Sequence, residues 1–348
     1  MRVKEVRLLQ RLSKVLNKNS LLLRRKDTNT SDGFSLVEVL VSLAILIIIC
    51  LISFSLIDST QTLWRKTSSR TEQFREARRA FERITQRLSQ ATLNTYWDYV
   101  DSSGAPRTVT NAAVFKPHKY ARQSELRYIQ LNSSSLSAPR GGQMVGQSVF
   151  FQAPLGATND ISMSSLNTIV NTVGFYIEKV SDSSFKPSFI PFSRERYRLF
   201  EFNEPSESLT VYSYTSGNSS YGGNEWFTIP LQNQNYSSRL TDNIVAMVFE
   251  AIYPDGNVIK KSHIYSSAPI PGPIQPAEAH NLPPSVKVTM IAVDEASARR
   301  LSDLSVTLID AVDDATLNAL ENQLLSLKLN FRKFQTAVQI GASKWSTQ

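Results

Sequence analysis

A long uninterrupted apolar run dominates the N-terminal part of the chain. From Phe34 to Ile57 there are 24 residues, and Glu38 is the only charged one. At about 1.5 Å per helical residue the run reaches roughly 36 Å, which is enough to cross the apolar core of a bilayer with some tilt. A buried helix of a soluble domain is the alternative, but such helices are rarely so long and so uniformly apolar. The pattern therefore predicts a transmembrane segment over residues 34–57.

After this run the pattern changes to a single apolar stripe. Gly and Pro are absent from residue 34 to residue 103, so we expect the helix to continue as an amphipathic segment over residues 58–103, fraying from about Asn94. Steps of three and four residues separate the members of the stripe, which are Phe74, Ala77, Phe81, Ile84, Leu88 and Ala91. A coiled-coil seam would have the same spacing. Packing against a sheet of the same chain is favoured, because the sequence after the stripe is β-rich.

From residue 105 onward, short runs of β-branched and aromatic residues alternate with clusters of Ser, Asn, Gly and Pro. The predicted strands are 125–131, 145–152, 169–179, 196–202, 244–253, 258–265 and 286–293. The sequence Tyr-Pro-Asp-Gly-Asn at 253–257 is a turn signal that joins two of them into a hairpin. Residues 203–224 and 266–284 are predicted loops.

The C-terminal part returns to a helical pattern before a last strand. Residues 295–330 lack Gly and Pro and contain leucines at helical spacing, and residues 331–340 are a predicted strand. The fold class predicted from the whole pattern is α+β, with one long N-terminal helix packed on an antiparallel sheet. Residues 104–348 would form an enlarged β-rich globular domain with a C-terminal helix and strand.

The charge distribution predicts an orientation in the membrane. The formal net charge is +8, but the first 33 residues alone carry +6, which leaves only +2 for the rest. A positive excess just before an apolar segment keeps that side cytoplasmic and predicts export of the chain beyond the segment. The nearly neutral remainder disfavours a nucleic acid as partner. The single cysteine, Cys50, excludes an intramolecular disulfide and reads as a small apolar residue.

Glu38 is the anomaly in the apolar run. A carboxylate inside a membrane costs at least a few kcal/mol unless it has a partner. If the chain were cut after Gly33, Phe34 would carry a free ammonium, and the ammonium of a neighbouring copy could neutralise Glu38. Alternatively, Glu38 could reach the headgroup layer from its place near the helix start.

The stretch Gly33-Phe34-Ser35-Leu36-Val37-Glu38, together with the apolar run, resembles the N-terminal signal of type IV pilins and type II secretion pseudopilins. The resemblance implies that a prepilin peptidase/methyltransferase cuts after Gly33 and methylates Phe34. It makes residues 1–33 a leader, longer than most in that family. It also implies that Glu38 guides assembly with other pilins or pseudopilins on an inner-membrane assembly platform.

Internal segments resemble particular subgroups. LPPSVKVTM at 282–290, followed by Asp294, is similar to the late strand of J-type minor pseudopilins. NTVGFYIEK at 171–179, RYRLFEF at 196–202 and the closing ASKWS are similar to the pilin-like proteins called Verru_Chthon cassette protein C. These resemblances imply a minor filament subunit with a single-pass anchor in membrane lipid and a periplasmic domain.

Candidate chemistry elsewhere is sparse, so we expect no enzyme, no cofactor and no metal. His118, His263 and His280 are expected to be surface residues. Arg194, Arg196 and Arg198 alternate along one predicted strand face, which favours a solvated basic face over a partner or DNA site. Asp313 and Asp314 could contribute to a calcium site, but an acidic pair at a helix N-terminus is favoured. The competing function is an anchored envelope-binding protein or adhesin that uses the 203–224 and 266–284 loops.

Overall fold

A computed structural model describes residues 35–108, 111–184, 186–215, 223–270, 274–304 and 306–345. The chain divides into two compact units, the first ending at Arg65 and the second beginning at Lys66. The described part of the first unit is helical, whereas the second holds the described strands. The predicted fold class is confirmed: a long N-terminal apolar helix and antiparallel β-sheets form an α+β architecture that is consistent with a pilin-like fold.

Helix α2 (Leu36–Ser89) ends earlier than the sequence pattern predicted. The prediction of helix through residue 103 is therefore wrong in its last part. The N–H of Ala91 donates to the carbonyl of Leu88, three residues earlier, which tightens the final turn. The next residues are aromatic and β-branched and form strand β1 (Tyr96–Val100). The sequence prediction took the first Gly or Pro as the end of the helix. Neither residue occurs near Ser89, so the true helix end was not predicted.

Three antiparallel sheets make up the strand content of the described chain. Strands β1 and β2 form a two-stranded sheet, a six-stranded sheet has the order β10-β3-β4-β5-β6-β7, and a four-stranded sheet has the order β12-β11-β8-β9. The strand bounds are β2 Lys119–Gln123, β3 Tyr128–Asn132, β4 Gln143–Pro154, β5 Val170–Ser181, β6 Glu195–Glu204, β7 Ser237–Asp242, β8 Ile244–Asp255, β9 Val258–Ser262, β10 Tyr265–Ser266, β11 Ser285–Val293 and β12 Phe331–Gln339. Each predicted strand segment contains a strand, but β1, β2 and β7 were not predicted.

The predicted hairpin is confirmed, with one difference. Strands β8 and β9 pair across the turn at Gly256, which has a positive φ of 60°. The predicted single strand 258–265 is instead two strands in two sheets, because β9 pairs with β8 whereas β10 pairs with β3. His263 and Ile264 therefore lie where the chain passes from one sheet to the other.

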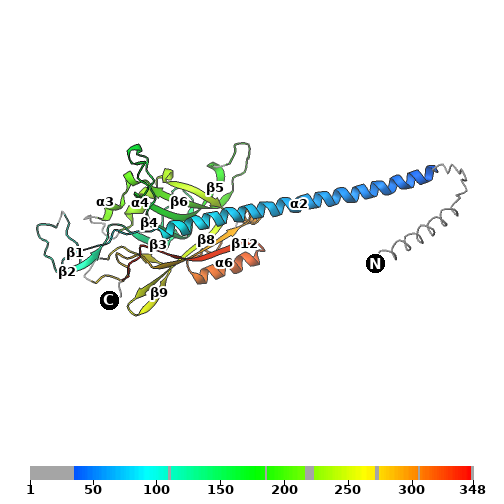
Figure 1. Ribbon diagram of the computed structural model, residues 1–348. Coiled ribbons are helices and arrows are strands. Elements are labelled where there is room, and N and C mark those ends of the chain that lie inside the picture. The colour runs from blue at the N-terminus through cyan, green and yellow to red at the C-terminus, as the bar shows by residue number, and fades with distance from the viewer. Residues whose placement is uncertain are drawn as a thin grey trace, which may run out of the picture. The chain divides into compact units, whose positions relative to one another are not determined.

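A central hydrophobic cluster joins the C-terminal part of α2 to both larger sheets. The predicted stripe is buried except for Phe74, which is half-buried. Its members share the cluster with Phe151 of the six-stranded sheet and Met290 of the four-stranded sheet. The ring of Phe81 lies 5.9 Å from that of Phe334. Figure 1 shows this end of α2 lying along the strands, so the predicted packing of stripe on sheet is confirmed.

Short helices cover the outer faces of the two larger sheets. Helices α3 (Val211–Thr215) and α4 (Glu225–Leu231) cover the six-stranded sheet, where the Phe227 ring stacks 4.3 Å from that of Phe150. Helices α5 (Glu295–Leu304) and α6 (Asp314–Ser326) cover the four-stranded sheet, mainly with leucines. The single helical region predicted for 295–330 is thus two helices, and described residues 306–313 between them are not helical.

Candidate functional site

Ser35 holds the first turn of the apolar helix. Both its hydroxyl oxygen, at 3.2 Å, and its carbonyl oxygen, at 3.0 Å, accept from the backbone N–H of Glu38. Ser35 is thus the N-cap and Glu38 the third helical residue, where a carboxylate lies near the positive end of the helix dipole. Glu38 therefore stabilises the helix start locally, whatever else it contacts.

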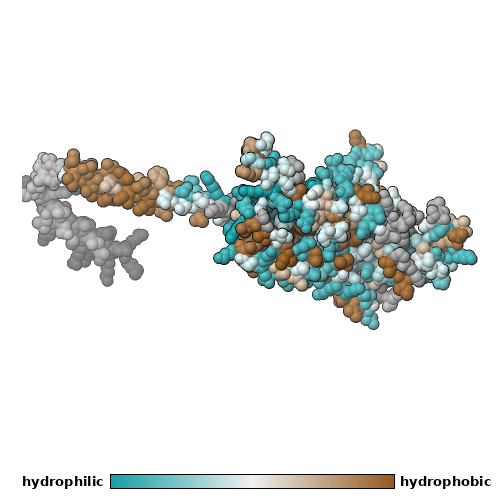
Figure 2. Space-filling model, turned by 180° about the vertical axis from the view of Figure 1, so that it is seen from behind, coloured by the Kyte–Doolittle hydropathy of each residue, from teal (hydrophilic) through white to brown (hydrophobic). Residues whose placement is uncertain are grey.

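The helix of the first unit exposes an apolar surface. Each large apolar side chain from Leu36 to Ile57 is at least 51 % exposed, so nothing else in the described chain covers it. Figure 2 shows these side chains as a continuous hydrophobic surface. The Ser42 and Ser53 hydroxyls donate at 2.8 Å to backbone carbonyls four residues earlier, so neither hydroxyl needs a water molecule as its hydrogen-bond acceptor. Of the described helices, this one alone is long and apolar enough to cross a membrane, which is consistent with a single-pass anchor.

Gly33 and Phe34, the predicted cut site and methylation site, lie outside the described residues. Of the three predicted site residues the structure therefore places Glu38 alone, one turn into the helix and exposed.

In the second unit, ion pairs fix the position of α2 against the sheets. Arg83 Nη2 lies 2.7 Å from Glu201 Oε2, and Arg70 Nε lies 2.8 Å from Asp294 Oδ2. Both carboxylates are almost fully buried, so each needs its arginine. Because the two pairs lie at separate points along the helix, they resist sliding of α2 along its axis.

The predicted basic face on β6 is not a solvated surface. Arg196 makes two parallel bonds to Glu295 of 2.8 and 2.9 Å, and Arg198 is buried beside Asp242 at 3.4 Å. Burial acts to raise the pKa of Glu295, but the hydrogen bonds from Arg196, Arg299 and Asn243 together outweigh it and lower the pKa to about 2. The prediction of a solvated face is wrong for both residues, because Glu295 of helix α5 binds Arg196, and Arg198 is buried beside Asp242 of β7.

The three histidines lie in different environments. His118 is exposed, as predicted, and His263 is half-buried. His280 is buried, so the surface prediction is wrong for it, and its Nδ1 accepts from the backbone N–H of Ser124 at 3.0 Å. Burial, together with the positive charge of Arg127, lowers the pKa of His280 to about 3. His280 is therefore neutral and structural at physiological pH.

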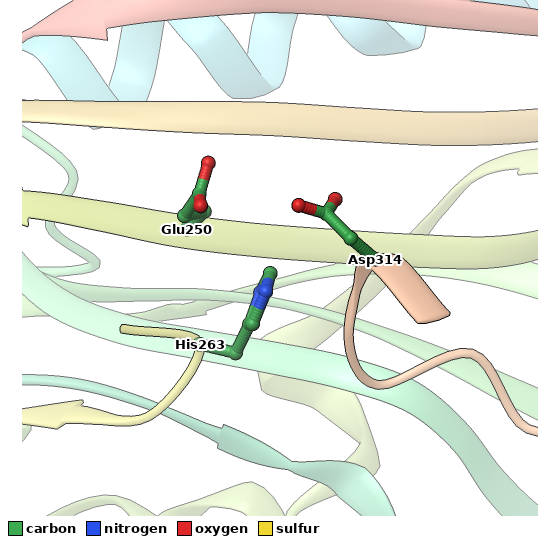
Figure 3. A group of neighbouring side chains, drawn as sticks. All are labelled: Glu250, His263 and Asp314. Carbon is green, nitrogen blue, oxygen red and sulfur yellow. The ribbon is translucent and has the colours of Figure 1, made fainter. Parts of the chain in front are cut away.

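One group of side chains combines metal-ligating types. Glu250 of β8, His263 and Asp314 of α6 each place a nitrogen or oxygen atom within 4.8 Å of the other two (Figure 3). Lys287 Nζ lies 2.8 Å from Glu250 and 3.3 Å from Asp314. Asp313 caps α6 instead, accepting from the Thr316 N–H at 2.8 Å, which confirms its predicted place at a helix N-terminus. Nothing in the local sequence marks this group, because its members come from distant segments.

The β1–β2 hairpin carries an exposed aromatic face. Trp97, Tyr99 and Tyr120 are each at least half exposed, and the rings of Trp97 and Tyr120 stack at 5.8 Å. Arg122, opposite Trp97 in the strand register, places its guanidinium 5.8 Å from the Trp97 ring. A groove of about 520 Å³ runs beside this face, lined by Trp97, Arg122, residues 275–277 and Trp345 among others. The alternation of aromatic residues in YWDY was a signal that could have revealed this face.

Comparison with protein families gives one match. Residues 28–54 match the model of the prokaryotic N-terminal methylation motif, which supports a type IV pilin-like protein. The match covers the expected cut site, Glu38 and most of the apolar run, and leaves the second unit unassigned. No curated protein and no solved structure matches the chain.

Proposed function

We propose that the chain is a prepilin-like structural subunit that is cut after Gly33, methylated on Phe34 and assembled through α2 into a periplasmic filament. A prepilin peptidase/methyltransferase processes it, and other pilins or pseudopilins are its partners on an inner-membrane platform. We further propose that it is a minor, J-type-like subunit. The observation that carries the proposal is the methylation-motif match over an apolar helix that nothing else in the described chain covers.

The geometry at Glu38 supports a role in assembly. The carboxylate is exposed and is the only charge in the apolar segment that ends at Ile57, so removing it from water requires a positive partner. The free ammonium of Phe34 in a neighbouring copy would supply that charge. A buried ion pair roughly breaks even in free energy, so the gain is in register: an incoming helix stops where the two charges meet.

Processing is tested first. Mass spectrometry of the protein from its native host should show a mature chain that begins at methylated Phe34. Gly33→Ala should remain uncut. A filament-associated wild-type chain that keeps residues 1–33 would refute the proposed processing.

Assembly is tested separately with two substitutions at one position. Glu38→Leu should insert and be cut normally but enter filaments poorly, whereas Glu38→Asp should retain much of the assembly because it keeps the charge. Cysteine crosslinking between neighbouring subunits measures this. Equal crosslinking in Glu38→Leu and wild type would remove the electrostatic role.

A second candidate function, an anchored binding protein, is favoured by the aromatic face of the β1–β2 hairpin. Tyr, Trp and Arg are the residue types that carry most binding energy at protein interfaces. Part of the predicted 266–284 binding loop lines the adjacent groove. If binding is the main function, Trp97→Ala should abolish binding of the envelope partner in the host, while processing and filament assembly stay intact.

A further inference from the structure

The fold brings three metal-ligating side chains together from three elements. Glu250 lies in the middle of β8, Asp314 is the first residue of α6, and His263 lies where the chain leaves one sheet for the other. Figure 3 shows the three side chains directed toward one shared space. Glu250 is buried, His263 half-buried and Asp314 exposed, so the group extends from the protein interior to the surface.

A backbone carbonyl orients the imidazole of His263. Its Nδ1 lies 3.1 Å from the carbonyl oxygen of Phe249, and a carbonyl can only accept a hydrogen bond. The neutral ring therefore carries its proton on Nδ1, which leaves the lone pair on Nε2. Metal-binding histidines are held in this way, with the non-ligating nitrogen donating to a carbonyl or carboxylate.

The donor set selects the class of metal. One imidazole nitrogen and two carboxylate oxygens suit Zn²⁺, which accepts mixed nitrogen and oxygen ligands and keeps a fourth position for water. Ca²⁺ and Mg²⁺ prefer oxygen ligands alone. Asp313 is not a member of the group, and its Oδ1 accepts from Thr316 in the cap of α6.

Lys287 is the competitor for this site. It lies directly opposite Glu250 in the β8–β11 register, and its ammonium contacts both carboxylates. The ammonium and a dication would occupy the same space and repel each other. The Lys287 side chain is 25 % exposed, which gives it a path to solvent.

We propose that Glu250, His263 and Asp314 form a Zn²⁺ site that the Lys287 ammonium closes in the metal-free protein. Zinc would connect β8, the crossing between the sheets and helix α6. Its binding to the folded state alone would stabilise the second unit by mass action. This inference does not depend on how the N-terminal segment is processed or assembled.

Isothermal titration of Zn²⁺ into the full chain tests the proposal. The protein is purified in detergent without a histidine tag and stripped of metal with EDTA. Wild type should bind one Zn²⁺ per chain, and His263→Ala should weaken binding by about tenfold or more. The control His118→Ala, which removes an exposed histidine elsewhere, should bind as wild type does. Lys287→Met, which removes the competing ammonium, should bind several-fold more tightly.

Other outcomes overturn the proposal. Zinc binding that is equal in wild type and His263→Ala would place the metal elsewhere. A wild-type chain that binds no zinc would leave Lys287 as the resident cation of a structural ion network, whatever Lys287→Met does. Tighter binding of Ca²⁺ than of Zn²⁺ would show that the metal class is wrong.

Discussion

Truncation of Ile84 would test the packing of α2 on the sheets. Ile84 is fully buried in the central cluster, one turn from Leu88. Ile84→Ala removes three buried carbons, worth about 0.8 kcal/mol each, and leaves a cavity, so the free energy of unfolding should fall by about 3 kcal/mol. Alanine is a good helix former, so the loss comes from packing rather than from helix propensity.

The measurement uses a fragment that begins at Lys66, since residues from there onward form one compact unit. At about 2.1 cal/mol/K per residue, a unit of about 280 residues has an unfolding entropy near 0.6 kcal/mol/K. The loss should therefore lower the Tm by about 5 °C in a calorimetric scan. Gln86→Ala, on the exposed side of the same turn, is the matched control and should shift the Tm by less than about 1 °C.

Equal melting of Ile84→Ala and Gln86→Ala would refute the reasoning. The stripe would then face solvent or another subunit, and contacts between the two larger sheets alone would have to stabilise the central cluster.

Three further predictions concern buried groups and can be measured on the same fragment. Burial raises the pKa of Glu204 from 4.5 to about 7. The contribution of Glu204 to the free energy of unfolding is therefore full below pH 4.5 and lost as the pH rises through 7. Glu204→Gln should have a free energy of unfolding about 3 kcal/mol above that of wild type at pH 8, and the same value as wild type at pH 4. The lowered pKa of His280 makes stability fall as the pH drops from 6.5 toward 3, and His280→Asn, which suits the φ of 57° and keeps an acceptor, should remove that dependence in acid titrations. A Cβ at Gly174 would lie 2.2 Å from the Phe150 ring, so Gly174→Ala should cost about 1–3 kcal/mol in urea unfolding, and an unchanged midpoint would contradict this close contact.

The sequence by itself determined the features that depend on neighbouring residues. The apolar run with Glu38, the α2 stripe and the turn at Gly256 arise from helical spacing or local turn preference, which a single segment contains. The N-terminal methylation motif belongs with them, because its cut site and carboxylate lie within one short stretch.

Only the tertiary structure decided which distant residues meet. Helix α2 ends at Ser89 because the chain beyond it pairs as strands. Arg196 is not a solvated residue, because Glu295 of a helix almost 100 residues later binds its guanidinium. His280 reads as a loop histidine in sequence, yet packing around it removes its charge. Glu250, His263 and Asp314 come together only because the chain passes from one sheet to the other at His263 and helix α6 packs beside β8. These residues are far apart in the sequence, so no spacing within one segment predicts their contact.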